Sequence, residues 1–300
     1  MTKNNEKLND FRNQLEKSNS EKKDLSRSEL SNLNLNEINL VNAKLNNSNL
    51  SRTSLENASL YGADLSSSDL FKANFEGANL SNSNLTNCNL LGVNFTNSKL
   101  RNINWGKDFK VKNELDAEQA MAIGNYELAI KKYKESEDIY RNLKISMQSQ
   151  TLGYETGEFF IREMTVRRKQ FKKISLKRLG SKIIEITTGY GERLSNIFGT
   201  MIFVIVICML LYGLEGVRYS DPINGDRIIG FFSQDTEKFG LFNTIGNLFY
   251  FSVVVYSTVG FGEIVPIGPI GKSVMIFEGI IGGLILAILI IALYKKSMDR

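Results

Sequence analysis

Five consecutive residues, Thr258, Val259, Gly260, Phe261 and Gly262, combine two features that favour the binding of a cation. Glycine at 260 and 262 tolerates backbone conformations that other residues disfavour, so successive carbonyl groups can turn toward one axis. Carbonyl oxygens stacked in rings can replace the water shell of an ion in a narrow pore. Thr258 adds a hydroxyl group at the inner end, and we expect Val259 and Phe261 to point back against the preceding helix. The spacing therefore predicts a cation site built from backbone oxygens.

The segments around these residues can carry them into a membrane. Residues 197–214 are eighteen residues without a charge, near the lower limit for crossing a hydrocarbon core of ~30 Å. Residues 273–294 form a second apolar run, which only Glu278 interrupts. Between them, residues 248–255 are apolar and aromatic and have the length of a half-helix. We expect two membrane-spanning helices and a re-entrant pore helix, whose C-terminal dipole end favours a cation.

This layout resembles the two-transmembrane potassium channels. Because four copies must meet on one axis to complete each carbonyl ring, we expect a homotetramer in a lipid bilayer. The resemblance implies that K+ is the permeant ion, bound at Thr258, Val259, Gly260 and Phe261, and that no cofactor is needed. A non-selective cation channel is the alternative, because small changes around such a filter can remove a binding site.

Three neighbours are expected to support the filter, namely Ser257, Glu263 and Val254. Glu263 stands where an aspartate usually follows the filter, and Val254 stands where some members of the family place a glutamate. The carboxyl pair that can brace the outer mouth is therefore absent.

The second apolar run contains candidate gating residues. Gly279, Gly282 and Gly283 are candidate hinges, with Gly282 at the hinge position that the resemblance implies. Close helix packing is the equal alternative for these glycines. Glu278 is an intramembrane acid, which indicates a functional residue, although it can instead be protonated or bonded to the pore-helix backbone. No helix with arginine at every third position precedes the pore, which excludes voltage sensing by that mechanism.

Charge predicts the topology. Eight basic residues precede the first span, and three follow the second: Arg167, Arg168, Lys169, Lys172, Lys173, Lys177, Arg178, Lys182, and then Lys295, Lys296, Arg300. Both termini should therefore be cytoplasmic in the cell membrane. The outer segment, 215–272, should begin with a polar turret that contains Asp221, Asp226, Asp235 and Glu237. We expect the amphipathic segment 174–187 to lie along the membrane surface.

A second stretch, T-G-Y-G-E at 188–192, superficially resembles the filter. It follows a basic, half-polar segment and lacks the valine between threonine and glycine. We predict a turn there, which leads the chain into the membrane.

The N-terminal part of the chain repeats every five residues. Leu, Phe or Trp occupies seventeen consecutive positions at this spacing, from Leu25 to Trp105. Many have a small residue two positions earlier and Asn or Asp immediately before them. A period of five fits neither a helix nor a strand, and it predicts a solenoid with the large and small residues inside. The Asn and Asp side chains should support the corners by bonding their own backbone.

This pattern resembles the pentapeptide-repeat family, which forms a right-handed quadrilateral β-helix with four repeats per coil. Leu33, Ile38, Val93 and Ile103 depart from the pattern by replacing small inward residues. Some relatives mimic DNA, but residues 24–105 carry seven acidic and six basic residues, and this balance argues against mimicry. The basic run at 167–182 lacks the aromatic stacking partners and Gly-rich loops that nucleic acid as a partner would require. We expect a scaffold for assembly or regulation, with an unidentified ligand or protein as a partner.

Helical periodicity follows the repeats, from about residue 117 to 173. Residues 124–130 look like the turn and second helix of a tetratricopeptide unit, and 158–168 continue as a third helix. Since one such unit cannot bury itself, it should pack on the solenoid or on another subunit. Only a few residues follow the second span, so regulatory input should arrive through these N-terminal regions.

Composition excludes several classes. The chain has no histidine, which removes His-based catalysis and His-bound zinc, and no catalytic constellation is present, so we expect no enzyme. Cys88 and Cys208 lie far apart in sequence, and we expect both to be reduced. Residues 1–23 lack the apolar core of a secretory signal.

The predicted fold is therefore multidomain. It comprises a polar leader at 1–23, the pentapeptide β-helix at 24–105, an α-helical connector at 106–174, an interfacial linker at 175–196, and an all-α tetrameric pore domain at 197–300. A membrane-anchored scaffold with a vestigial pore is the remaining alternative.

Overall fold

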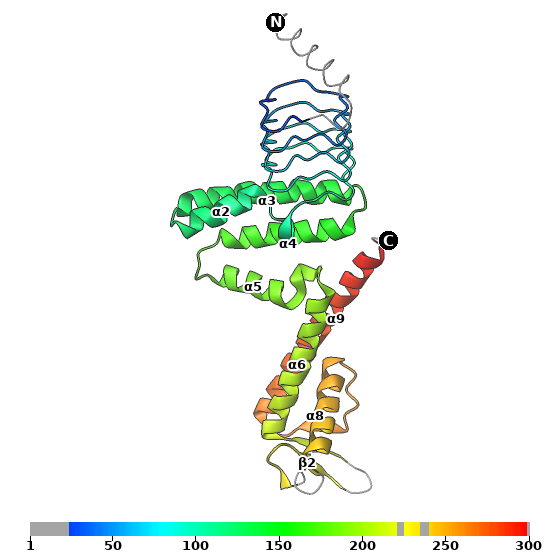
Figure 1. Ribbon diagram of the computed structural model, residues 1–300. Coiled ribbons are helices and arrows are strands. Elements are labelled where there is room, and N and C mark those ends of the chain that lie inside the picture. The colour runs from blue at the N-terminus through cyan, green and yellow to red at the C-terminus, as the bar shows by residue number, and fades with distance from the viewer. Residues whose placement is uncertain (1–23, 221–224, 235–239, 299–300) are drawn as a thin grey trace, which may run out of the picture. The chain divides into compact units, whose positions relative to one another are not determined.

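The computed structural model describes residues 24–220, 225–234 and 240–298. The predicted leader, 1–23, and the turret residues Asp221, Asp235 and Glu237 lie outside the described residues. The described residues divide into two compact units, one up to Lys182 and one from Ile183 to Met298 (Figure 1).

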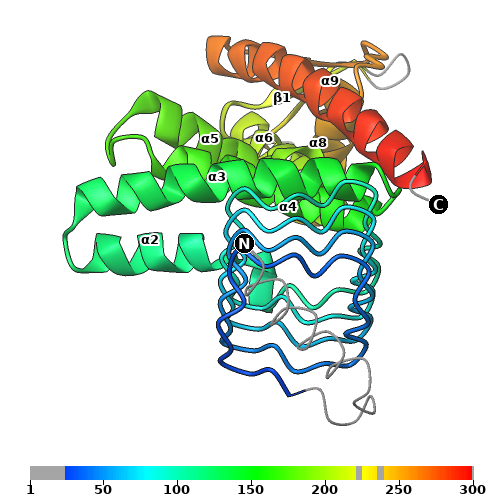
Figure 2. The same cartoon turned by 90° about the horizontal axis from the view of Figure 1, so that it is seen from above.

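The first unit begins with a stack of coils (Figures 1 and 2). Residues pair in parallel with residues twenty positions further along, as in Asn34 with Ser54 and Asn49 with Asp69. The Leu30 N–H donates to the Asn49 carbonyl at 2.8 Å. Twenty residues are four pentapeptides, so each coil takes four repeats. The predicted pentapeptide-repeat β-helix is confirmed.

The large and small residues fill the coil as their spacing predicts. Leu35, Leu45 and Leu65 are fully buried, and Ala43 and Ala63 are buried beside them. Removing so much apolar surface from water is the main stabilising contribution to a narrow solenoid. Of the four departures from the pattern, Ile38 and Val93 are buried, and Leu33 and Ile103 pack on the core from partly buried positions.

Two structural features form the corners of the coil. The Asn and Asp before each large residue act as expected, because Asn49 Oδ1 accepts from the Ser51 N–H at 3.0 Å and Asp64 Oδ1 from the Ser66 N–H at 3.1 Å. The second feature, a left-handed backbone residue at each corner, was not predicted. The second residue after each large one, from Leu25 to Leu100, has a left-handed backbone, with φ of 61° at Asn82. Asparagine and glycine, which tolerate this conformation, occupy most of these positions and are the signal that could have located it.

Three helices complete the first unit: α2 (Lys112–Ala122), α3 (Tyr126–Gln148) and α4 (Gly153–Lys169). A short 3-10 helix, Lys107–Phe109, precedes them. The predicted turn joins α2 to α3, and the Asn125 side chain caps α3 by accepting from the Leu128 N–H. The Trp105 ring, at the end of the coil, meets Phe159 of α4 edge to face at 5.2 Å. Coil and helices therefore share one hydrophobic core.

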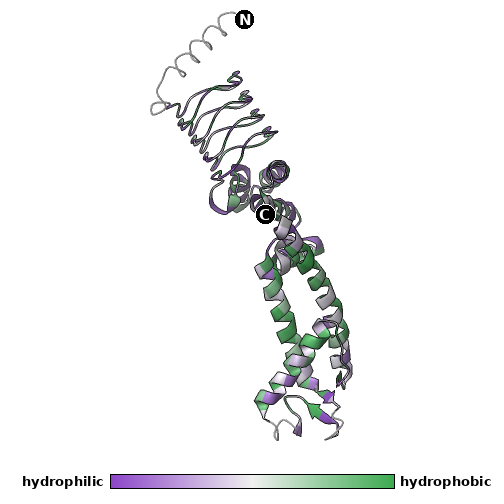
Figure 3. Cartoon of the chain, turned by 90° about the vertical axis from the view of Figure 1, so that its right-hand side faces the viewer, coloured by the Kyte–Doolittle hydropathy of each residue, from purple (hydrophilic) through white to green (hydrophobic). Residues whose placement is uncertain are grey.

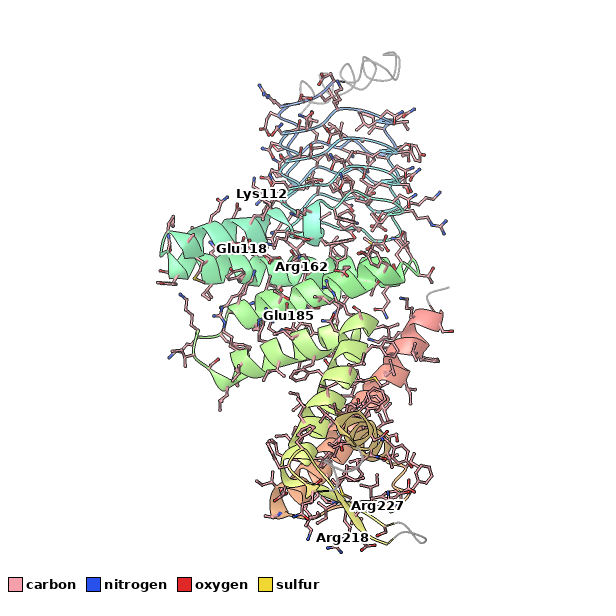
Figure 4. The ribbon with its side chains drawn as sticks, turned by 60° about the horizontal axis from the view of Figure 1, so that its bottom comes forward. Lys112, Glu118, Arg162, Glu185, Arg218 and Arg227 are labelled. Atoms are coloured by element: carbon pink, nitrogen blue, oxygen red, sulfur yellow. The ribbon has the colours of Figure 1, made fainter. Side chains whose placement is uncertain are left out.

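A buried ionic cluster joins α2 to α4. The Glu114 side chain is fully buried and accepts from the Tyr140 hydroxyl at 2.6 Å and from Lys169 Nζ at 2.9 Å. Arg162 Nη1 lies 3.8 Å from the same carboxylate. Figure 4 labels Arg162 on α4 and Glu118 on α2, which also accepts from Lys169, at 2.8 Å.

Helix α5 (Leu176–Thr188) connects the two units. Its exposed residues include Leu179, Ile183 and Ile186, so its apolar face is uncovered in the single chain. The T-G-Y-G-E stretch then forms a 3-10 turn, Gly189–Gly191, in which Tyr190 has a φ of 56°. This turn is what the sequence predicted in place of a second filter.

The second unit is built on two long helices, α6 (Leu194–Glu215) and α9 (Pro269–Met298). Both are long and apolar enough to cross a membrane, and Figure 3 shows hydrophobic residues along most of their length. Between them lie β1 (Val217–Tyr219), β2 (Arg227–Ile229), α8 (Leu241–Tyr256) and β3 (Ile264–Pro266). The strands form an antiparallel sheet in the order β2-β1-β3, with Val217 opposite Ile229 on one side and Pro266 on the other.

Candidate functional site: a loop after the re-entrant helix

Helix α8 leads directly to the predicted filter. It begins at Leu241, seven residues before the predicted start, because residues 241–247 continue the helix although they are less uniformly apolar. Its buried face includes Leu248, Phe251 and Ser252. The helix ends in a tight turn, in which the Ser257 N–H donates to the Val253 carbonyl at 2.9 Å. A supporting role of the Ser257 side chain in the filter stays a prediction.

The backbone of the loop alternates in conformation. Thr258, Gly260 and Gly262 have φ values of 59°, 59° and 81°, whereas Val259 and Phe261 are not among the positive-φ residues. This left-handed region is open to glycine at little cost and disfavoured for threonine. Alternation of left-handed and ordinary backbone is the property that these glycines were predicted to supply, because it lets successive carbonyl groups turn toward one axis.

One side of this loop is open in the single chain. A Cβ atom added to Gly260 or Gly262 would meet no atom within 4 Å. Val259 is 56% exposed and Phe261 is 68% exposed. Phe261 lines a hollow against Val254 and Tyr250 of α8, as the expected backward orientation requires, but Val259 is not among the residues that line it. The loop is therefore largely uncovered in the single chain.

The exit of the loop is fixed by the sheet and by one side-chain bond. The Ser220 N–H donates to the Glu263 carbonyl at 2.9 Å, and Tyr219 stands opposite Ile264. The Tyr250 hydroxyl donates to Glu263 Oε1 at 2.5 Å. The missing carboxyl partner at Val254 was predicted from the sequence, whereas this phenol, one helical turn earlier on α8, was not. The sequence signal for this partner was a tyrosine four residues before Val254, because residues four apart lie on the same face of a helix.

Glu278 lies at the meeting point of three helices. Its carboxyl group is fully buried, with Oε1 2.5 Å from Ser252 Oγ of α8 and Oε2 2.7 Å from the Tyr212 hydroxyl of α6. The sequence analysis considered a bond to the pore-helix backbone, whereas the structure pairs the acid with side chains. These partners come from distant segments, and the sequence carried no signal for them.

The three candidate hinge glycines differ in their surroundings. A Cβ atom on Gly282 would overlap the Tyr256 backbone, lying 3.1 Å from its carbonyl carbon and closer still to its oxygen. Gly279 and Gly283 have nothing within 4 Å. Close packing therefore accounts for Gly282, while a hinge at any of the three remains a prediction.

Models of known protein families match both the C-terminal and the N-terminal part of the chain. The model described as "Ion channel" matches residues 224–296. The model described as "Pentapeptide repeats (8 copies)" matches residues 24–60, 34–70 and 63–102. The chain therefore contains an ion-channel domain and a pentapeptide-repeat region, and the ion-channel family is not one of enzymes.

Solved structures that resemble the chain include three pentapeptide repeat proteins. The protein alr5209 from Nostoc Pcc 7120 is 30% identical, over 31% of this chain and 73% of that one, with a TM-score of 0.28. Rfr23 from the cyanobacterium Cyanothece 51142 is 48% identical, over 27% and 58%, with a TM-score of 0.23. AT2G44920 from the Arabidopsis thaliana thylakoid lumen is 28% identical, over 29% and 66%, with a TM-score of 0.21. A comparison with curated protein sequences gives no match.

Proposed function

We propose that the chain is one subunit of a homotetrameric potassium-selective channel, in which K+ passes through Thr258, Val259, Gly260, Phe261 and Gly262. The observation that carries the proposal is the alternating backbone of this loop, with positive φ at 258, 260 and 262, at the end of a re-entrant helix. In a tetramer the backbone carbonyls would form the stacked oxygen rings that replace the hydration shell of K+.

The open face of the loop supports assembly of four copies. An apolar surface containing Val259 and Phe261 would be unstable beside water or an empty pore, and neighbouring subunits around one axis would cover it. The C-terminal end of α8 carries partial negative charge from its unpaired carbonyls, and this favours a cation close to the inner end of the loop.

The two spans would hold this unit in the cell membrane with both termini in the cytoplasm. Lys295 Nζ, near the end of α9, donates to Glu192, just before α6, at 2.7 Å. The beginning of the first span and the end of the second therefore lie at the same end of the helix pair. Basic residues flank both segments, so the positive-inside rule assigns that end to the cytoplasm. The amphipathic α5 would lie at the same membrane surface.

In this proposal the pentapeptide coil and helices α2–α4 are a cytoplasmic scaffold for assembly or regulation. If they carry a gating input, deletion of residues 1–170 changes open probability in bilayer recordings. Unchanged gating after this deletion would contradict a regulatory role and leave assembly as the function of the scaffold.

Potassium flux from liposomes containing the purified full-length protein tests the proposed function. The wild-type protein should release K+ down its gradient, and Gly260→Ala should abolish the release, because alanine disfavours a φ of 59°. Gly246→Ala is the matched control, since Gly246 lies within α8 with open space around it, and it should keep the flux. Flux that survives Gly260→Ala would contradict conduction through this loop. No flux from the wild type would favour a scaffold with a vestigial pore.

A further inference from the structure

The buried carboxyl group of Glu278 has a hydrogen-bonding pattern that favours its protonated, uncharged form. Ser252 Oγ lies 2.5 Å from Glu278 Oε1 and also 2.9 Å from the Ile205 carbonyl oxygen. A hydroxyl group has one proton, so it can donate to only one of these two oxygens. Both contacts are hydrogen bonds when Glu278 carries a proton and donates it to Ser252, which then donates to Ile205. The other oxygen accepts from Tyr212.

The resulting chain of bonds connects three helices. Tyr212 and Ile205 belong to α6, Ser252 to α8, and Glu278 to α9. The Cys208 thiol of α6 also faces the carboxyl group. An uncharged acid with all of its partners satisfied avoids the large cost of a charge in a membrane interior. We call this set of contacts the helix tie.

The helix tie holds the helix that leads into the filter. Gly282 follows Glu278 by four residues on α9, and its close contact, Tyr256, follows Ser252 by four residues on α8. Residues four apart share one face of a helix. Helix α9 therefore contacts one face of α8 at two successive turns, at Ser252 and at Tyr256. The second of these residues is two positions before Thr258. Movement of α8 along α9 would displace the loop and its carbonyl groups.

We propose that Glu278 is a positioning residue for ion selectivity: as an uncharged carboxylic acid it holds α8 against α6 and α9, and so fixes the spacing of the filter carbonyls. This inference rests on the proposed potassium-selective function. It differs from a role as an ion-attracting charge, because it requires hydrogen bonds and no charge at position 278.

Reversal potentials of the reconstituted full-length channel in mixed potassium and sodium provide the test. Glu278→Gln should keep the wild-type permeability ratio of Na+ to K+, because an amide can also donate to Ser252 while accepting from Tyr212. Tyr212→Phe should raise the ratio roughly threefold to tenfold, the range for loss of one buried hydrogen bond, and Glu278→Leu, which loses the bonds to both Ser252 and Tyr212, should raise it at least as much. Tyr294→Phe on the same helix as Glu278 is the control and should leave the ratio unchanged, since the Tyr294 side chain is exposed and takes no part in the helix tie.

Two results would overturn the inference. If Glu278→Gln raises the ratio as much as Glu278→Leu, the residue acts through its charge. If Glu278→Leu and Tyr212→Phe reduce only the yield of tetramers, at an unchanged ratio, the helix tie has a merely structural role. Should Glu278→Leu fail to assemble, Tyr212→Phe decides, because it removes one hydroxyl and keeps the ring. A wild-type channel without potassium selectivity contradicts the proposed function itself, before any variant is considered.

Discussion

The ionic cluster around Glu114 allows a quantitative test of the first unit. Replacing this residue by glutamine keeps the volume and one acceptor for the Tyr140 hydroxyl, but it removes the charge that faces Lys169 and Arg162. Burial lowers the pKa of Lys169, but the Glu114 and Glu118 carboxylates more than offset this, and its pKa is raised above the usual value. The ammonium group therefore depends on these two partners.

The expected cost follows from the burial of each partner. Removing one member of a fully buried ion pair costs about 3–5 kcal/mol. Here the Lys169 side chain is 21% exposed and keeps its bond to Glu118, so we expect Glu114→Gln to lower the free energy of unfolding by about 2 kcal/mol, as for loss of one charged hydrogen bond. The matched variant Glu118→Gln removes a carboxylate that is 34% exposed, and we expect a cost of less than about 1 kcal/mol.

Urea unfolding of the full-length protein in detergent measures both variants. Trp105 is the only tryptophan in the chain and contacts Phe159 at the junction of coil and helices, so its fluorescence reports on the first unit alone. If the slope of unfolding free energy against urea concentration is unchanged, the shift in the urea midpoint gives the change in the free energy of unfolding. A midpoint for Glu114→Gln equal to or above that of Glu118→Gln would refute the ranking by burial.

Three further predictions concern the coil, the ionic cluster and the outer mouth. Asn82→Val should destabilise the first unit by about 1–2 kcal/mol and Asn82→Gly should have little effect, because the position requires a left-handed backbone; a valine variant as stable as the wild type in urea would contradict this. Burial raises the pKa of Glu118, but hydrogen bonds from two lysines outweigh it and hold the pKa below its ordinary value of 4.5. The carboxylate of Glu118 should therefore stabilise the fold above pH 4.5, and this contribution should be lost as the pH falls below that value. The urea midpoint should then shift less on acidification in Glu118→Gln than in the wild type, and equal shifts would contradict the prediction. Tyr250→Phe removes the hydroxyl that donates to Glu263, and sustained potassium currents should decay roughly threefold to tenfold faster than in the wild type. The exposed Tyr294→Phe is the control, and equal decay in both variants would exclude a role for the Tyr250 bond.

Much of the coil could be predicted from the sequence because its contacts are local and periodic. The large residue at every fifth position identified the core from Leu30 to Leu100, and the Asn or Asp before it identified one corner contact. The left-handed position two residues after the large residues Leu25 to Leu100 was not predicted, because it is a property of the backbone and not of a side-chain contact. A backbone preference of this kind is visible only as an enrichment in Asn and Gly.

The pore was predictable in outline and less so in its side-chain contacts. The apolar runs located α6 and α9 to within a few residues, but α8 begins seven residues earlier than predicted, at Leu241. The bonds of Glu278 and Glu263 depend on which faces of separate segments meet. One sequence does not contain that information, and both acids consequently lacked partners until the fold was known.

The reversal potential of the full-length protein in a planar bilayer, with potassium on one side and sodium on the other, tests the central claim most directly. If K+ is selected by carbonyl rings at Thr258 to Phe261, the reversal potential should lie far toward the equilibrium potential of K+. A potential near zero would show a non-selective pore and contradict the account of the filter.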